Sequence, residues 1–261
     1  MVSQEVTVDV AGAPMPGYLA RPDDAAGVRP AVIVLQEIFG VNTEVKRITD
    51  LLAGAGYVGL AINYYHRTDP DLNEPYTPEG LKSGFKAAGA VTKGSLLADV
   101  AAAIDWLNSQ DFVEFNHIAS WGFCFGGTVA FLSATLPGLS GAICFYGGSI
   151  AAPLPSGEAE ALADVDRIRC PLLLAYGGQD DYISPAAIER TRAALTAAHK
   201  TFELEVYPDQ GHAFFRDCGI LLGPEADGRR TPPAIPDGSR TPHAVADAWD
   251  RVQAFLRTHL R

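Results

Sequence analysis

The residues from His117 to Gly127 combine a nucleophile with closely spaced glycines. A short apolar run ends at Gly122, Cys124 follows, and small and apolar residues resume from Gly126. A nucleophile between two such glycines is typical of a strained turn from a strand into a helix, which lifts one side chain above a sheet. The sequence therefore predicts a thiol nucleophile at Cys124. The alternative is a buried structural cysteine in a glycine-rich turn.

A thiol nucleophile needs a base within hydrogen-bond reach and a third group that orients the base. Asp180 follows the apolar run that ends at Tyr176, and His212 follows the run that ends at Tyr207. The carboxyl ends of parallel strands gather at one edge of a sheet. We therefore predict that His212 is the base and that Asp180 orients it.

Other residues compete for these two roles. Asp181 adjoins Asp180, which is preferred because it closes the preceding glycine-rich turn. Three further histidines are disfavoured by position: His117, His199 and His259. The first is expected before the strand that leads to Cys124 (the elbow strand), and the other two are expected near helix ends. Two more are expected in loops and remain alternatives to His212: His66 and His243.

Strands and helices alternate along nearly the whole chain. Two short strands at 6–10 and 16–20 are expected to form an antiparallel hairpin at a sheet edge. Continuous apolar runs predict strands buried on both faces at 31–35, 57–63 and 171–176. Further strands are predicted at 141–146 and 202–207. Helices are predicted between or after them: 43–53, 95–108, 184–199 and 244–260. This alternation predicts one α/β domain over residues 1–261, with a mostly parallel twisted sheet and helices on both faces.

Two stretches depart from this alternation. Residues 65–94 are rich in proline, glycine and aspartate, with room for a short helix at 78–88. Residues 223–242 are rich in proline and predict a solvated loop. Long excursions from a compact α/β core commonly cover an active site. We expect residues 65–94 to do so here.

Composition excludes several classes of function. Hydrophobic residues make up 48% of the 261 residues and charged residues 20%, so a large core is expected. The formal charge of −11 argues against binding to nucleic acid or to an anionic membrane surface. No apolar run approaches the roughly 20 residues that a membrane helix needs, and no signal peptide is evident at the N-terminus.

Four cysteines stand at positions 124, 144, 170 and 218, with no Cys-x-x-Cys spacing. This spacing disfavours a zinc ribbon or a redox-active pair. A reduced, cytoplasmic protein is the simplest expectation.

Four motifs in order along the chain together resemble the dienelactone hydrolase family. They are Gln36-Glu-Ile-Phe-Gly40, Gly122-Phe-Cys-Phe-Gly-Gly127, Gly177-Gly-Gln-Asp180 and Gly211-His-Ala-Phe-Phe-Arg216. The resemblance covers nearly the whole chain. It implies an α/β-hydrolase fold with a Cys124–His212–Asp180 triad.

The resemblance also implies roles for other residues. The backbone N–H groups of Ile38 and Phe125 would form the oxyanion hole. A glutamate at the place of Glu37 helps to activate the thiol, and an arginine at the place of Arg216 pairs with it or with an anionic substrate. No metal ion or organic cofactor is implied. The implied partner is a small ester or lactone.

This sequence departs from the family pattern in two places. The prototype carries another arginine for the substrate carboxylate before the helix that precedes the elbow. Here the corresponding stretch offers only Lys82 and Lys86, which become the candidates for that role. Tyr146, at the end of a predicted strand, is a further candidate for binding substrate. The stretch 217–241 is longer than the family usually carries after its histidine.

These observations predict a carboxylic ester hydrolase of carboxymethylenebutenolidase type that works through a thioester on Cys124. Two alternatives remain. One is a general carboxylesterase on the same scaffold, and the other is a redox-sensing protein that kept the elbow cysteine without turnover. The complete Cys, His and Asp set favours an enzyme, because a sensor needs no base held by an aspartate.

Overall fold

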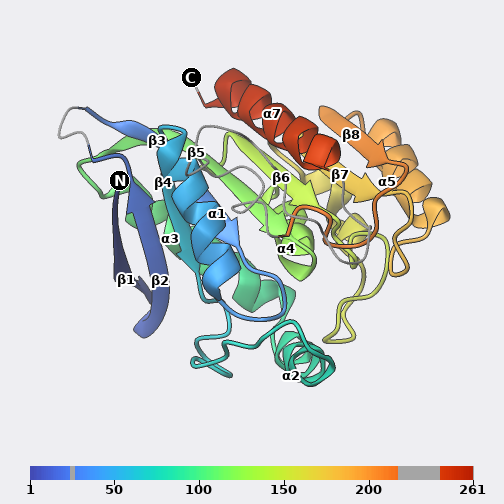
Figure 1. The fold of residues 1–261 in the computed structure, drawn as a ribbon, viewed down its shortest axis with the longest axis horizontal. Helices are drawn as coiled ribbons and strands as arrows, with labels where there is room; N and C mark the ends of the chain where they lie inside the picture. The colour runs from blue at the N-terminus through green and yellow to red at the C-terminus, as the bar shows by residue number, and fades with distance from the viewer. Residues whose placement is uncertain (24–26, 217–241, 261) are drawn as a thin grey trace.

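The computed structural model describes residues 1–23, 27–216 and 242–260, and its centre is one mixed sheet of eight strands. Along the chain the strands are β1 (Val2–Val10), β2 (Ala13–Arg21), β3 (Arg29–Leu35), β4 (Val58–Ile62), β5 (Val113–Phe123), β6 (Gly141–Phe145), β7 (Leu172–Gly177) and β8 (Phe202–Tyr207). In space their order is β1-β2-β4-β3-β5-β6-β7-β8 (Figure 1). The β1–β2 and β2–β4 pairs are antiparallel and all other pairs are parallel.

Helices pack on both faces of this sheet. They are α1 (Thr43–Gly54), α2 (Pro78–Gly89), α3 (Lys93–Asn108), α4 (Phe125–Ser133), α5 (Pro185–Ala197) and α7 (Pro242–His259), with a 3₁₀-helix η1 (Ala161–Arg167). Helices α1 and α7 cover one face, α3 and α4 cover the other, and α2 lies outside both layers (Figure 1). The predicted α/β class, with a mostly parallel sheet and an N-terminal hairpin, is confirmed.

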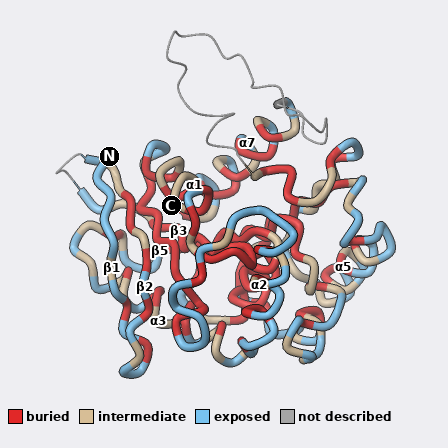
Figure 2. Tube along the Cα trace, turned by 60° about the horizontal axis from the view of Figure 1, so that its bottom comes forward, coloured by how far each residue is buried: buried red, intermediate tan, exposed pale blue. Residues whose placement is uncertain are grey.

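The central strands are buried because helices cover them on both sides. Every residue of β4, β6 and β7 is buried, as their continuous apolar sequences predict. Figure 2 shows this core enclosed by exposed loops, with the outer strand β1 largely exposed. No single helix of the described chain is long and apolar enough to cross a membrane; α2 and α3 qualify only as a pair, which is bent by 90°.

Several elements differ from the sequence-based predictions. The hairpin strands are longer than predicted, because residues 2–5 of β1 are exposed and carry no hydrophobic alternation that would reveal a strand. Helix α3 begins at Lys93 because the Thr92 side chain caps it, in a capping box with Ser95. His117 lies inside β5 rather than before it. Helix η1 was not predicted. The predicted loop at 223–242 lies almost entirely outside the described residues.

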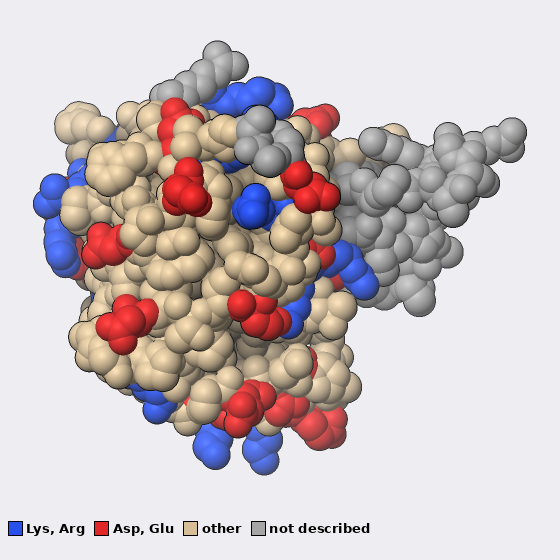
Figure 3. Space-filling model, turned by 90° about the vertical axis from the view of Figure 1, so that its left-hand side faces the viewer, with Lys and Arg blue, Asp and Glu red and all other residues tan. Residues whose placement is uncertain are grey.

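Charged side chains do not gather by sign on the outer face of the hairpin. Figure 3 shows this side of the molecule, where the lysines, arginines, aspartates and glutamates that it draws are interspersed with other residues. That arrangement offers no continuous basic surface on the described part of this face.

The topology fixes where a site can form. The chain passes from β3 to β4 on one side, then returns to place β5 on the other side of β3. The loops that follow β3 and β5 therefore leave the sheet in opposite directions and open a crevice at their carboxyl ends. Glu37 and Cys124 stand in these two positions, and Asp180 and His212 follow β7 and β8.

The turn from β5 into α4 depends on close backbone contacts. A Cβ on Gly122 would lie 1.8 Å from the carbonyl oxygen of Gly126, and one on Gly127 would lie 2.4 Å from that of Phe145. A Cβ on Gly126 would lie 2.2 Å from the carbonyl oxygen of Leu35. These atoms are backbone and cannot move aside as a side chain can. Only glycine at all three positions allows α4 to start so close to β3 and β6.

Gly126→Ala should therefore destabilise the protein strongly, by about 3 kcal/mol, the upper part of the usual range for overpacking. Gly54 in α1 is the matched control, because nothing lies within 4 Å of a Cβ built there. Gly54→Ala should leave stability unchanged or raise it. Urea denaturation of both variants measures the difference. Equal midpoints for both would show that α4 is not packed as closely as described.

Candidate active site

Cys124 stands at the sharpest point of the turn between β5 and α4. Its backbone has φ 53° and ψ −116°, a conformation that residues other than glycine rarely adopt. The Cys124 N–H donates to the carbonyl oxygen of Phe145 at 3.1 Å, which ties the turn to the neighbouring strand β6. The strained turn presents the thiol at the carboxyl edge of the sheet, as the Gly-x-Cys-x-Gly pattern predicts.

The structure brings Cys124, His212 and Asp180 together. His212 Nε2 lies 3.2 Å from Cys124 Sγ, and His212 Nδ1 lies 2.8 Å from Asp180 Oδ2. The other carboxylate oxygen of Asp180 accepts the N–H groups of Tyr182 and Ile183 at 2.8 and 3.0 Å. These two bonds fix the carboxylate so that its second oxygen faces the imidazole. Asp180 therefore holds the histidine, whereas its alternative, Asp181, is exposed.

The two loops that carry Asp180 and His212 fit against each other. A Cβ on Gly177 would lie 2.4 Å from the carbonyl oxygen of Gln210, and one on Gly178 would lie 2.7 Å from the Cα of Pro208. The Gln179 N–H donates to the Gln210 carbonyl at 2.8 Å. The two glycines therefore allow the contact that sets the distance between acid and base.

Opposing effects act on the pKa of His212. Burial of the ring disfavours its charged form and is the largest single effect. The charge of an ionised Cys124 and the hydrogen bonds to Asp180 and Cys124 act in the opposite direction. They prevail and raise the pKa of His212 from 6.5 to about 10. A negative charge that develops on Cys124 would therefore stabilise a proton on the neighbouring imidazole.

The two residues predicted to supply the oxyanion donors both line the pocket that contains Cys124. Phe125 is the first residue of α4, so its N–H has no acceptor within the helix. Ile38 lies in the loop after β3 and lines the same pocket as Cys124 and Phe125. Within the described chain, neither N–H donates to another backbone or side-chain group. Both are available to a substrate, as the family resemblance implies.

A cavity of about 530 Å³ opens above the thiol. Cys124, His212 and the two residues with the candidate oxyanion donors all line it. Leu81 and Phe85, four residues apart on α2, contribute an apolar wall, and Tyr182 lies against the His212 ring at 5.0 Å between centroids. The walls are therefore mainly apolar and suit a substrate with an apolar body.

A polar end of the cavity is built around Tyr76. The guanidinium of Arg216 lies over its ring, 4.4 Å from the centroid, and the Asn42 amide donates to its hydroxyl at 3.2 Å. Burial raises the pKa of Tyr76, and the neighbouring Glu37 carboxylate raises it further. Glu37, Tyr76 and Arg216 all line the cavity, so one acid, one phenol and one cation meet at this end.

Three residues predicted to contact the substrate lie outside the lining of this cavity. Lys82 and Lys86 are exposed and do not line the cavity, because α2 turns Leu81 and Phe85 toward it instead. Tyr146 is 1% exposed and lies outside the cavity lining. Its ring packs beside His212, at 5.3 Å between centroids, so it supports the base.

The alternative histidines lie away from the thiol. His66 is buried and its ring nitrogens face Pro14 and Asp99, at 3.1 Å each. His243 is the second residue of α7 and, like His66, is not among the residues that line the cavity. Among the described residues, no three His, Cys, Asp or Glu side chains are grouped as a metal site requires. The stretch 217–241, with Cys218, lies outside the described residues.

Sequence reasoning missed Tyr76 and Tyr182. Tyr182 stands two residues after Asp180, in a loop after a strand, and that position was a usable signal. Tyr76 lies in the stretch 65–94, which was expected to cover the site, but nothing in the sequence distinguishes it from other residues there.

Comparisons with known proteins agree with this geometry. The sequence model of the dienelactone hydrolase family matches residues 15–260. A protein of Synechocystis described as "putative carboxymethylenebutenolidase" is 32% identical over 98% of this chain and 96% of its own. One of Escherichia coli K12 with the same description is 37% identical over 78% of this chain and 74% of its own.

A solved structure has the same fold. The crystal structure described as "putative dienelactone hydrolase" from Klebsiella pneumoniae superposes with a TM-score of 0.80 and 29% identity, covering 98% of both chains. The predicted α/β-hydrolase fold is therefore confirmed. With a family match that spans nearly all of the sequence, this chain belongs to the dienelactone hydrolase family.

Proposed function

We propose that the protein hydrolyses a small ester or lactone, of the kind cleaved by carboxymethylenebutenolidases, through a thioester on Cys124. The single observation that supports this most is the chain of contacts from Cys124 Sγ to His212 and on to Asp180, at 3.2 and 2.8 Å. A base held by a carboxylate beside a thiol is the arrangement that nucleophilic acyl transfer requires.

In the first half of the reaction, His212 accepts the thiol proton and the thiolate attacks the substrate carbonyl carbon. The carbonyl oxygen becomes an oxyanion, which the N–H groups of Ile38 and Phe125 stabilise. The tetrahedral intermediate collapses, the carbon–oxygen ester bond breaks, and His212 returns the proton to the departing alkoxide. In a lactone this alkoxide stays joined to the acyl group.

In the second half, water attacks the thioester. His212 takes a proton from the water, a second tetrahedral intermediate forms in the same oxyanion hole, and the thiolate departs. The imidazolium returns its proton to the thiolate, or keeps it as the ion pair. Asp180 orients the ring throughout.

The cavity also suggests what the substrate looks like. Its wall along α2 is apolar, whereas Arg216 supplies a positive charge at the Tyr76 end. A substrate carboxylate that binds Arg216 would draw positive charge away from Glu37. Glu37 would then be free to help remove the thiol proton, which links substrate recognition to activation of Cys124. Small neutral esters would still react through His212, but less efficiently.

Replacing Cys124 distinguishes an enzyme that turns over from a redox-sensing protein that does not. Cys124→Ala should reduce kcat/KM for a chromogenic ester to less than about a hundredth of the wild-type value, while Cys170→Ala, at a buried cysteine outside the cavity, should remain active. Wild-type protein should show a burst followed by steady turnover. A single stoichiometric acylation without turnover would instead indicate a sensor, and a fully active Cys124→Ala would exclude the thioester.

A negative charge on Cys124 raises the pKa of His212, and removing the thiol tests this effect. In Cys124→Ala the attraction to Cys124 and its hydrogen bond are lost, whereas burial still disfavours the imidazolium. The pKa of His212 should therefore fall from its raised value of about 10, and the ring should lose its proton at a lower pH. NMR titration of ring nitrogens measures this.

Arg216 should set the preference for anionic substrates. For a matched pair of esters, one bearing a carboxylate, we expect wild type to favour the carboxylate roughly tenfold or more in kcat/KM, the value of one charged hydrogen bond. Arg216→Ala should remove most of this preference and affect the neutral ester less. Lys82→Ala, which removes an exposed cation outside the cavity, is the control and should keep the preference. Equal rates for the pair in wild type would contradict activation through Glu37.

A further inference from the structure

Two adjacent buried tyrosines follow strand β4, and only one of them contacts the loop after β3. Tyr64 is 1% exposed and its hydroxyl donates to the carbonyl oxygen of Gln36 at 2.5 Å. A longer contact of 3.3 Å joins the same hydroxyl to the carbonyl oxygen of Glu37. Tyr65 is equally buried, but its hydroxyl bonds to no carbonyl of that loop and interacts with the Tyr64 hydroxyl instead.

The carbonyls that Tyr64 contacts are directly linked to the oxyanion hole. The Glu37 carbonyl and the Ile38 N–H belong to one planar trans peptide group, so they point in opposite directions. Holding the carbonyl oxygen on the Tyr64 side therefore directs the N–H to the other side. The preceding peptide, held through Gln36, removes the remaining freedom of rotation.

The Tyr64 ring also contacts the second donor. It meets the ring of Phe125 edge to face, with centroids 6.0 Å apart. One side chain thus contacts both the peptide group that carries the Ile38 N–H and the ring of Phe125, without lining the cavity itself. Burial raises the pKa of Tyr64 well above its usual value, so the hydroxyl remains a neutral donor at working pH.

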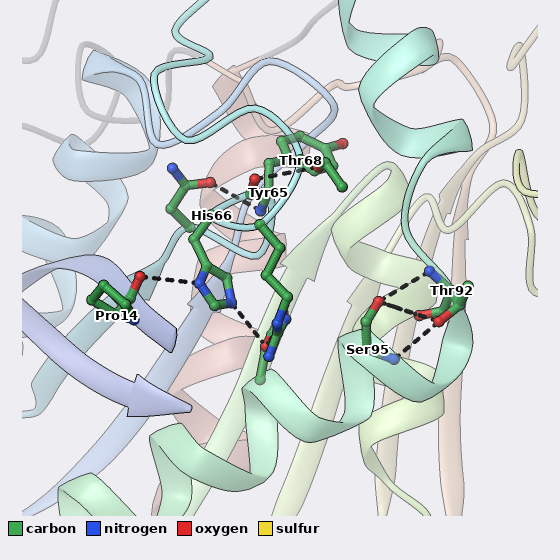
Figure 4. Close-up of polar contacts among 9 residues, drawn as sticks. Pro14, Tyr65, His66, Thr68, Thr92 and Ser95 are labelled. Carbon is green, nitrogen blue, oxygen red and sulfur yellow. Dashed lines mark hydrogen bonds and ion pairs between the residues drawn. The ribbon is translucent and has the colours of Figure 1, made fainter. Parts of the chain in front are cut away.

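The segment that carries Tyr64 is firmly held on its other side. The Asn63 side chain accepts the Tyr65 N–H at 3.0 Å, and Thr68 donates its N–H to the Tyr65 carbonyl at 2.8 Å. Figure 4 shows the ring of the next residue, His66, facing the carbonyl of Pro14, 3.1 Å from its Nδ1. The other ring nitrogen, Nε2, lies 3.1 Å from the Asp99 carboxylate. The segment therefore forms a fixed support behind the loop after β3.

We propose that Tyr64 is a positioning residue for the oxyanion hole, whose hydroxyl aims the Ile38 N–H at the reacting carbonyl. The inference rests on the proposed acyl transfer. It predicts that losing the hydroxyl impairs only steps that create an oxyanion. Removing one oxyanion donor outright costs about a hundredfold or more in rate, so misdirecting one should cost at least about tenfold.

The test compares two reactions of the same thiol in wild type and Tyr64→Phe. Hydrolysis of a chromogenic ester passes through an oxyanion, whereas alkylation of Cys124 by iodoacetamide displaces iodide and forms none. In Tyr64→Phe, kcat for the ester should fall at least about tenfold with little change in KM. The alkylation rate, followed by mass spectrometry of the Cys124 peptide, should stay within about twofold, because the thiol and His212 are untouched.

Tyr65→Phe is the matched control, since it removes a neighbouring, equally buried hydroxyl that bonds to no carbonyl of the loop after β3. It should leave both reactions unchanged. Only one oxygen atom is removed in each variant, and circular dichroism checks that both fold. A second variant carries 4-aminophenylalanine at position 64; its N–H donor should restore the ester rate to within about threefold of wild type.

The outcomes separate this inference from the proposed function. A wild type that hydrolyses no ester in a broad panel contradicts the proposed function and, with it, the inference. An active wild type with unchanged ester turnover in Tyr64→Phe contradicts the inference alone. Equal losses in Tyr64→Phe and Tyr65→Phe, a parallel loss of alkylation, or no recovery with 4-aminophenylalanine would each show that the Tyr64 hydroxyl does not act through the oxyanion hole.

Discussion

The positive φ of Cys124 is the constraint on which the rest of the site depends. A non-glycine residue held this way costs about 1–3 kcal/mol, so the fold around it must fix it from both sides. Strand β5 does this on one side and α4 on the other, and the contacts of Gly122 and Gly126 with neighbouring backbone leave the turn no alternative path. Because α4 starts immediately after the thiol, the Phe125 N–H comes with the same turn. The nucleophile and one oxyanion donor are thus consequences of a single strained residue.

Charge in this site lies against a dense aromatic core. Behind the catalytic groups, Phe123, Phe145 and Phe214 pack with Tyr146, and Tyr146 touches the His212 ring. Such surroundings strengthen electrostatic attraction, but they also make an unpaired charge costly. The structure offsets that cost locally: two backbone N–H groups hold one oxygen of Asp180, and the imidazole faces the other. Removing a single partner therefore affects the whole chain of contacts.

The sequence predicts the chemistry better than the binding surface. Cys124, Asp180 and His212 each follow a strand of the parallel part of the sheet. Parallel strands bring their carboxyl ends to one edge, so order along the chain is enough. Lys82 and Lys86 were misplaced because their position depends on the rotation of α2 about its axis, which composition does not reveal. Tyr146 has φ 40° and packs inward, away from the cavity. The contact of Tyr64 with Gln36 depends on the register of β4 against β3, which a single sequence leaves open.

The residues that carry out the reaction and those that contact the body of the substrate lie on separate elements, because of how α2 packs on the core. A Cβ on Gly84 would lie 2.7 Å from the carbonyl oxygen of Ile38, so this helix rests its backbone directly on the loop that supplies an oxyanion donor. Leu81 and Phe85 project from the same helix into the cavity. Substitution at these two positions changes the wall that a substrate meets, while Gly84 keeps the helix against Ile38. The residues that select a substrate can therefore vary without displacing Cys124, His212 or the oxyanion hole, which the sheet and its loops hold independently.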